Sequence, residues 1–328
     1  MMTFFQKTAL AALLATIFLL YVGAIVRATG SGLGCPDWPK CWGVLIPPTS
    51  LDQVDFDKLN IEKFQRRDPT ITKETLSAEF NPVHVWVEFI NRLLSLPVGL
   101  FTLATFLFSF QFLRKRKSVF FGSLFALLLV LTNAVLGAIV VRSGLKPGVI
   151  TLHMALAIIL LCVFVFVIYR GGDRVPFVNF GSKGPIRSLL ILLFIGCVVE
   201  GVMGSQVREI TDELALKFKD TPRDEWHQTL EQKPIYLLHR SFSWAILIIG
   251  IILYTKTRKT TGDLGQLSLK VVFGIILAQM FLGILMSHVS VHPVVQVLHI
   301  GLSSILIVAL FWLILASKKH EHAKLVEL

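Results

Sequence analysis

Charged residues are scarce in this sequence. Asp, Glu, Lys and Arg make up 16% of its 328 residues, whereas hydrophobic residues make up 54% and the mean hydropathy is +0.70. A soluble domain usually contains about 25% charged residues, so this composition excludes an ordinary soluble protein. We therefore expect an integral membrane protein.

The sequence also lacks a small-residue cleavage site after its first apolar run. We interpret this run as a retained membrane helix and not as a removed signal peptide. About 20 apolar residues are needed to cross the hydrocarbon core of a bilayer, and further runs meet this requirement. We predict an all-α fold with eight transmembrane helices, at residues 9–26, 85–113, 119–141, 149–169, 188–207, 235–254, 269–288 and 294–316.

Basic residues are few in every second connection between these helices. Lys and Arg gather at residues 114–117, 170–187 and 256–259 and in the C-terminal tail, whereas the intervening short loops hold only Arg142 and Lys146 or none. By the positive-inside rule, the basic connections and both termini are cytoplasmic. The net charge of +11 then reflects topology and does not indicate nucleic-acid binding. We expect a protein of the bacterial plasma membrane, surrounded by lipid.

Two connections, residues 29–84 and 209–234, are longer than the others and lie on the predicted outer side. Long loops in compact bundles often cover a functional site or bind a partner. We expect one of these roles for both loops, since each leads directly into the next transmembrane helix.

The two halves of the sequence repeat one pattern. The second matching pair of motifs starts at residues 90 and 238, an offset of 148, and the third at residues 133 and 279, an offset of 146. Four helices are an even number, so both repeats start on the same side of the membrane and run parallel. We predict two pseudo-symmetric four-helix bundles, residues 1–170 and 171–328, each able to hold a cofactor in its core. The matching motifs are GAIVR (23–27) with GSQVR (204–208), INRLLS (90–95) with LHRSFS (238–243), NAVLG (133–137) with QMFLG (279–283), and VITLHMAL (149–156) with VVQVLHIGL (294–302).

Three histidines, His153, His239 and His299, occupy repeat-related positions inside predicted spans. A strongly polar group at membrane depth needs a partner. One such histidine is readily explained by a hydrogen bond between helices, but three at matching positions favour a binding site. His239 and His299 come from two helices of one bundle at similar depth, as axial ligands of a haem iron do. Zinc is a weaker choice, because cysteine or carboxylate ligands are not expected there.

Arginines near these histidines are candidates for binding haem propionates. Arg240 follows His239, and Arg208 lies at the outer end of the preceding helix. Guanidinium groups bind carboxylates well, although interaction with lipid headgroups would also explain them. We include Arg27, the repeat counterpart of Arg208, and Arg92, the repeat counterpart of Arg240, among the cofactor-binding candidates.

The first repeat departs from this pattern, because Asn91 stands where the second has His239. Glu88, Asn91 and Arg92 share one helix face, which we expect to face His153. The first bundle would then hold a haem with one strong ligand and an open position, as chemistry at a metal requires. A simple ion pair within the helix is the alternative for Glu88 and Arg92.

The motifs taken together resemble the haem A synthase family, membrane enzymes of cytochrome oxidase biogenesis. The likeness extends over all eight helices and implies oxidation of a ring methyl of haem O to a formyl group, giving haem A. The motifs that carry it are GAIVRATGSGLGCPDWPKCWG (23–43), EFINR (88–92), LHMAL (152–156), LLHRSFS (237–243) and VLHIGLSS (297–304).

The resemblance implies roles for individual residues. His239 and His299 would be the axial ligands of a bound haem b, and His153 would hold the substrate haem. Glu88 would be the acidic residue needed for activity. Asn91 stands where family members have a second histidine, so its contact with the iron is left open.

The outer-loop cysteines also match the family. Cys35 and Cys41 correspond to its first cysteine pair, and a disulfide is expected between them in an oxidising compartment. The sequence leaves open whether this disulfide is structural or redox-active. No second cysteine pair occurs in residues 209–234.

Two other functions remain as alternatives. The protein could be a two-haem b electron-transfer subunit, or a non-catalytic haem carrier or assembly chaperone. For the favoured function the expected partners are haem O and a membrane electron acceptor such as quinone. Contacts with a haem O synthase and with oxidase assembly factors are implied by the family alone, and homo-oligomer formation is left open.

Overall fold

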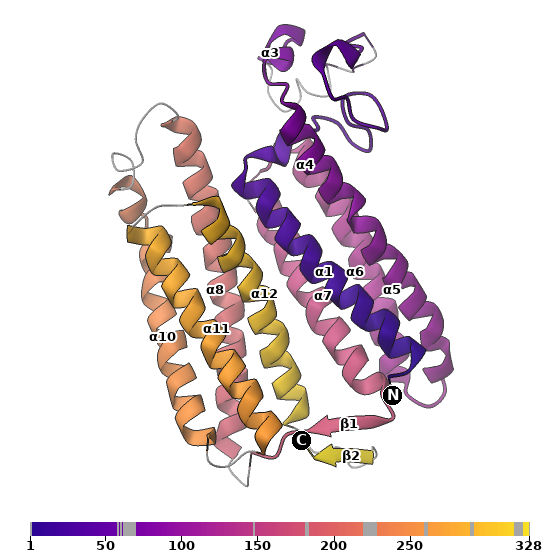
Figure 1. The fold of residues 1–328 in the computed structure, drawn as a ribbon, viewed down its shortest axis with the longest axis vertical. Coiled ribbons are helices and arrows are strands. Elements are labelled where there is room, and N and C mark those ends of the chain that lie inside the picture. The colour runs from indigo at the N-terminus through magenta and orange to yellow at the C-terminus, as the bar shows by residue number, and fades with distance from the viewer. Residues whose placement is uncertain are drawn as a thin grey trace.

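The computed structural model consists almost entirely of long helices (Figure 1). It describes residues 2–57, 59, 61, 70–146, 148–180, 184–218, 228–258, 262–288, 292–317 and 324–327. The long helices are α1 (Phe4–Ala28), α4 (Pro82–Leu93), α5 (Ser95–Ser109), α6 (Lys117–Arg142), α7 (Val149–Gly171), α8 (Gly184–Lys217), α10 (Pro234–Thr257), α11 (Asp263–His288) and α12 (Pro293–Ala316). The short elements are η1 (Ser31–Leu33), η2 (Leu51–Gln53), α3 (Lys73–Ala78), η3 (Phe110–Phe112), β1 (Arg174–Phe177) and β2 (Lys324–Glu327).

The predicted all-α membrane fold is confirmed. Eight helical segments in the described part of the chain are long and apolar enough to cross a bilayer, with α4, α5 and η3 together forming the second. Many large apolar side chains on these helices are exposed on the outside of the molecule. Such a surface suits contact with lipid, whereas exposing it to water would be unfavourable. Strongly exposed examples are Phe4, Leu100, Val135, Trp244 and Phe281.

The second span is broken at Leu94, between α4 and α5. Pro97 has no N–H to donate to the carbonyl of Leu93, and its ring crowds that carbonyl. The sequence analysis predicted one continuous helix here and overlooked this effect. The two helices still form one membrane span, and α4 contacts η1 of the outer loop.

Helix α8 is longer than a membrane crossing needs. Its 34 residues extend over about 51 Å, whereas the hydrocarbon core is about 30 Å thick. The expectation that a loop begins at residue 209 was therefore wrong, because residues 209–217 continue the helix. Residues 219–227 of the expected loop lie outside the described residues. The outer part of α8 carries polar side chains that contact the neighbouring half.

The long helices form two groups (Figure 1): α1, α4, α5, α6 and α7 lie together, and α8, α10, α11 and α12 form the other group. Helix α12 packs against both α1 and α7 of the first group. The contact is close at Gly301, where an added Cβ would lie 2.0 Å from ring atoms of Tyr21. The division at residue 170 and the repeat relationship remain predictions.

A short parallel sheet was not predicted from the sequence. Strand β1 pairs with β2 in a register that places Arg174 beside Lys324 and Phe177 beside Glu327. It joins the connection between α7 and α8 to the C-terminal segment, at the end of the molecule where the N-terminus also lies (Figure 1).

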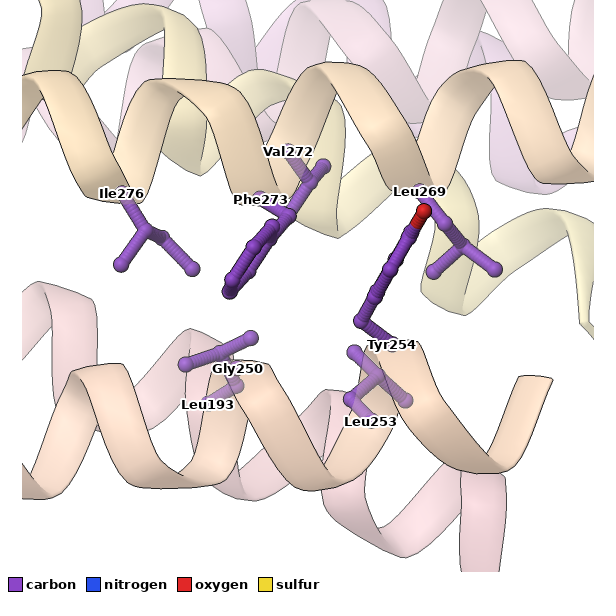
Figure 2. A pocket seen from close by; sticks show the side chains of 8 residues that line it. All are labelled: Leu193, Gly250, Leu253, Tyr254, Leu269, Val272, Phe273 and Ile276. Carbon is purple, nitrogen blue, oxygen red and sulfur yellow. The ribbon is translucent and has the colours of Figure 1, made fainter. Parts of the chain in front are cut away.

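The core of the second group is tightly packed at this same end. Figure 2 shows a small apolar pocket between α8, α10 and α11. The rings of Tyr254 and Phe273 stack with centroids 5.1 Å apart, and a Cβ on Gly250 would meet Ile276 at 3.0 Å. The pocket offers no carboxylate, histidine or basic group among its lining residues, so we assign it to packing and not to function.

Candidate functional site

A cavity of about 470 Å³ lies among α8, α10, α11 and α12. Its volume is in the range of small-molecule and cofactor sites. Most of its wall is apolar, and polar and charged side chains occur at a few positions. Helices α1 and α7 of the first group contribute to the wall through Leu20 and Arg27, and through Thr151, Met154, Ala155 and Ile158.

His239 on α10 and His299 on α12 both line this cavity. Each ring has a buried Nδ1 atom without a hydrogen-bond partner in the described structure. Each ring also lies against a glycine of a neighbouring helix: a Cβ on Gly204 would be 3.3 Å from Cε1 of His239, and one on Gly283 would be 3.8 Å from Cε1 of His299. The structure thus brings the two histidines together in one space, as the sequence analysis proposed.

Sequence reasoning missed Glu200, a third polar residue of this cavity. Its Oε1 atom lies 3.2 Å from Nδ1 of His239 and accepts a hydrogen bond from the hydroxyl of Ser243. The premise that no carboxylate is available near the histidines was therefore wrong. A usable signal existed, because an acidic residue inside the fifth apolar run, one turn before Gly204, is unusual in a membrane helix.

Arg27, Arg208 and Arg240 reach the wall of the same cavity. Nε of Arg27 lies 3.0 Å from Oδ2 of Asp212, and Nη2 of Arg208 lies 2.7 Å from Oδ1 of Asp212. Nη2 of Arg208 also donates to the backbone carbonyl of Arg27 at 3.0 Å. These contacts join α1 to α8 and place two cations beside the cavity.

Arg240 has a looser environment. Nη1 of Arg240 lies 3.5 Å from Oε1 of Glu231, and the guanidinium stands 5.5 Å above the ring of Tyr236. The hydroxyl of Tyr236 shares a 2.9 Å hydrogen bond with Ser287. Asp212 and Glu231, which pair with the cavity arginines, were not identified from the sequence.

The first group repeats the glycine contacts. A Cβ on Gly137 would lie 3.6 Å from Cε1 of His153, and one on Gly23 would lie 3.9 Å from Oδ1 of Asn91. Nδ1 of His153 and Oδ1 of Asn91 are buried without a hydrogen-bond partner in the described structure. His153, Asn91, His239 and His299 thus each lie against a glycine of another helix.

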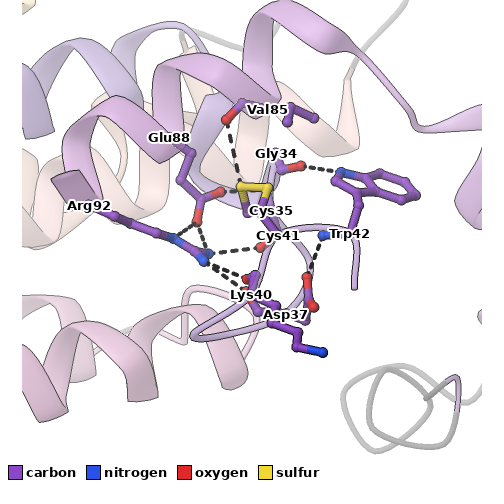
Figure 3. Close-up of polar contacts among 9 residues, drawn as sticks. All are labelled: Gly34, Cys35, Asp37, Lys40, Cys41, Trp42, Val85, Glu88 and Arg92. Atoms are coloured by element: carbon purple, nitrogen blue, oxygen red, sulfur yellow. Dashed lines mark hydrogen bonds and ion pairs between the residues drawn. A yellow bond between two sulfur atoms is a disulfide. The ribbon is translucent and has the colours of Figure 1, made fainter. Parts of the chain in front are cut away.

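Glu88 and Arg92 hold the outer loop against α4, as Figure 3 shows. The Glu88 carboxylate accepts the N–H of Cys35 at 2.8 Å and pairs with Arg92 through Nε at 3.1 Å and through Nη2. The remaining guanidinium donors go to the backbone carbonyls of Cys35, Asp37 and Lys40, at 2.8 to 3.0 Å. All five N–H groups of Arg92 are thus used within the protein.

This arrangement changes the interpretation of that helix face. The ion pair weighed as an alternative from the sequence is present, and Arg92 has no N–H left for a haem propionate. The expected common face towards His153 stays a prediction. The structure adds that Glu88 and Arg92 bind the outer loop, which the spacing along α4 does not show, and that Oδ1 of Asn91 lies beside Gly23 of α1.

The disulfide between Cys35 and Cys41 is confirmed. Both cysteines are buried in a small apolar core of the outer loop, together with Trp42. The carboxylate of Asp37 accepts the N–H groups of Trp42 at 2.6 Å and of Gly43 at 3.0 Å. The described part of the loop is thus built around a small apolar core. No group of three or more His, Cys, Asp or Glu side chains suited to a metal ion occurs among the described residues.

Comparison with known proteins gives consistent matches over most of the chain. Residues 6–314 match a family described as cytochrome oxidase assembly protein. A relative from Pelagibacter ubique named "Heme A synthase" is 27% identical over 91% of this chain and 92% of its own length. One with the same name from Shewanella oneidensis is 25% identical over 90% and 91%. Another, from Bartonella bacilliformis, is 24% identical over 73% and 71%.

Proposed function

The chain belongs to the family of cytochrome oxidase assembly proteins, and we propose that it is a haem A synthase, which oxidises a ring methyl of haem O to the formyl group of haem A. The resemblance to the haem A synthase family seen in the sequence is confirmed by the family match and by the names of the relatives. The finer assignments below are our proposal for how this chain performs the reaction.

The observation that carries the proposal is the cavity of the second group, which two imidazoles and three arginines line. His239 and His299 both present their imidazole rings to this cavity, and glycines of neighbouring helices let each ring pack closely. This donor set fits a haem b with two histidine ligands. Bound there, haem b would supply one-electron transfer.

The arginines of this cavity suit the propionates of such a haem. Arg208 is mostly buried, with its Nε atom unpaired in the described structure. Arg27 and Arg240 expose more of their side chains. A guanidinium binds a carboxylate through two parallel hydrogen bonds, and Asp212 keeps two of these cations close together.

The first group is our candidate for the substrate site. His153 and Asn91 would face the iron of haem O from different helices, with Asn91 as a weaker ligand or none. Glu88 remains our candidate for holding or moving a proton near the methyl group, and Arg92 now has the role of keeping that carboxylate and the outer loop in place. The Cys35–Cys41 loop would then close the outer end of this site against water.

The setting of the reaction follows from the fold and the charge pattern. We propose that the protein lies in the bacterial plasma membrane with both termini cytoplasmic, so that the disulfide loop faces the oxidising outer side. A membrane electron acceptor such as quinone would take up the electrons. A haem O synthase would be the natural source of substrate.

The function is tested by extracting and chromatographing the haems of protein purified from cells that make haem O. Wild type should contain haem b together with haem O, its alcohol or haem A. His299→Ala should lose haem b. His153→Ala should keep haem b and lose the oxidised products, and His84→Ala serves as a control because His84 lies in the first turn of α4.

Other outcomes would favour the alternatives. Two equivalents of haem b and no haem O derivative would indicate an electron-transfer subunit. Haem O bound without oxidation, with no effect of Glu88→Gln, would indicate a carrier or chaperone. Either result would overturn the synthase proposal.

A further inference from the structure

We propose that Glu200 is a positioning residue for His239, holding the imidazole by accepting its Nδ1–H so that the opposite ring nitrogen is presented to the haem iron. This inference rests on the proposed function, because it assumes that His239 is a haem ligand. It assigns a role to a carboxylate that lies inside a membrane span and that the reaction scheme above does not use.

The carboxylate of Glu200 lies beside the imidazole of His239, so that an acceptor and a potential N–H donor are neighbours. Oε1 of Glu200 is 3.2 Å from Nδ1 of His239, and the side chain of Glu200 is 17% exposed. Neither Nδ1 of His239 nor Oε2 of Glu200 has a hydrogen-bond partner in the described structure, and both atoms are buried. The hydroxyl of Ser243, one turn along α10 from His239, fixes the carboxylate through Oε1.

A buried carboxylate needs this kind of partner. Leaving a charged or polar group unpaired away from water is costly. Arg208, about two turns along α8 from Glu200, pairs with Asp212. A ligating histidine commonly donates its second ring N–H to a carboxylate, which fixes its tautomer and raises its basicity.

The two halves of the protein differ at this position. Gly204 of α8 corresponds to Gly23 of α1, so the residue four before it corresponds to Leu19, which cannot accept a hydrogen bond. The first half likewise has Asn91 in place of His239. The carboxylate thus occurs together with the histidine and is replaced together with it, as expected if the two act as a pair.

The redox consequence follows from ligand basicity. A histidine that donates to a carboxylate gives more electron density to the metal, which stabilises the oxidised iron. Removing the negative charge should raise the midpoint potential of the second-half haem. Mutating a second-shell partner commonly changes metal affinity or activity about tenfold or more. A change of the same size in a one-electron equilibrium corresponds to about 59 mV.

The test uses purified full-length protein carrying its haem b. Midpoint potentials are measured by optical redox titration for wild type, Glu200→Gln, Ser243→Ala and Glu209→Gln. The last variant is the matched control, since Glu209 is a carboxylate of the same helix that accepts its hydrogen bond from Thr151, at 2.9 Å. Electron paramagnetic resonance of the oxidised haem gives a second signal that depends on the orientation of the imidazole rings.

We expect Glu200→Gln to raise the midpoint potential by about 59 mV, which is a tenfold change in the one-electron equilibrium, and to change the resonance signal. Ser243→Ala should have a smaller effect, and Glu209→Gln should match wild type. If Glu200→Gln folds but loses haem b while Glu209→Gln keeps it, the positioning role is also supported. Equal effects of Glu200→Gln and Ser243→Ala would mean that the contact between α8 and α10 matters and the carboxylate does not. If the haem of Glu200→Gln keeps the wild-type potential and signal, only the role of Glu200 is refuted. If the wild-type protein contains no haem with two histidine ligands, the proposed function is refuted as well.

Discussion

Replacing Arg92 by methionine should release the disulfide loop from α4. The substitution keeps an apolar stem but removes all five N–H donors, so three loop carbonyls and the Glu88 carboxylate lose their partner. Glu88 then keeps the N–H of Cys35. The side chains of Glu88 and Arg92 are only 4% and 16% exposed, so water cannot replace the lost donors until the loop moves.

The size of the effect can be worked out from this burial. Removing one member of a buried ion pair costs about 3–5 kcal/mol. Each step of about 1.4 kcal/mol changes an equilibrium constant about tenfold, so local opening of the loop should become about 10²- to 10⁴-fold more frequent. Such local openings occur without unfolding of the whole protein.

Reduction of the Cys35–Cys41 disulfide reports this opening. The two cysteines are 0% and 1% exposed, so a phosphine reductant should reach them mainly when the loop opens. The new thiols are labelled with a maleimide and located by peptide mass spectrometry. Arg142→Met is the control, because its guanidinium stacks on Trp38 of the same loop at 5.6 Å without a buried carboxylate. Equal reduction rates in the two variants would refute the reasoning.

Three further predictions concern packing and charge, and are measured in detergent micelles. Gly301→Ala should lower the thermal midpoint, because its Cβ would overlap Tyr21 and overpacking costs about 1–3 kcal/mol. Adding Tyr21→Ala should relieve the overlap in the double variant. Gly99→Ala, whose Cβ meets nothing within 4 Å, should leave the midpoint unchanged. Gly204→Ala should reduce haem b binding by displacing the His239 ring, whereas Gly274→Ala, also in open space, should bind normally. Asp212→Asn should lower the thermal midpoint only modestly, since the ion pairs of Asp212 are partly exposed. The decrease in midpoint should be smaller at high salt, which screens charges. A decrease that does not depend on salt would argue against an electrostatic origin.

Much of this fold could be predicted from the sequence, because about 20 consecutive apolar residues are needed to cross a bilayer and such a segment must form a helix to satisfy its backbone hydrogen bonds. All eight spans followed from this rule. The prediction that His239 and His299 share one cavity came from their similar depth on two helices of the same predicted bundle. The glycines opposite them were already part of the repeated motifs, although their contact with the rings became clear only in three dimensions.

The contacts that could not be predicted depend on segments distant in the sequence. The guanidinium of Arg92 binds carbonyls more than fifty residues earlier in the chain, and no periodicity of α4 indicates where that loop will lie. Helix α8 continues past residue 209 because its outer turns pack on the first half, through Asp212 and Arg27. The role of Glu200 depends on its contact with His239 of another helix, which the sequence of the fifth apolar run does not show.

Helix α7 connects the two proposed haem sites physically. His153 on this helix lies against Gly137 of α6, whereas Thr151 and Met154 line the cavity that contains His239 and His299. The helix therefore forms a wall with one site on each side. An α-helix with its side chains is about 10–12 Å across, so in the proposed function an electron leaving the substrate site would cross a single layer of protein. In the proposed function the difference between the two sites would suit their roles, because a relay works best with a saturated, rigidly held iron, whereas a reacting site needs an open position.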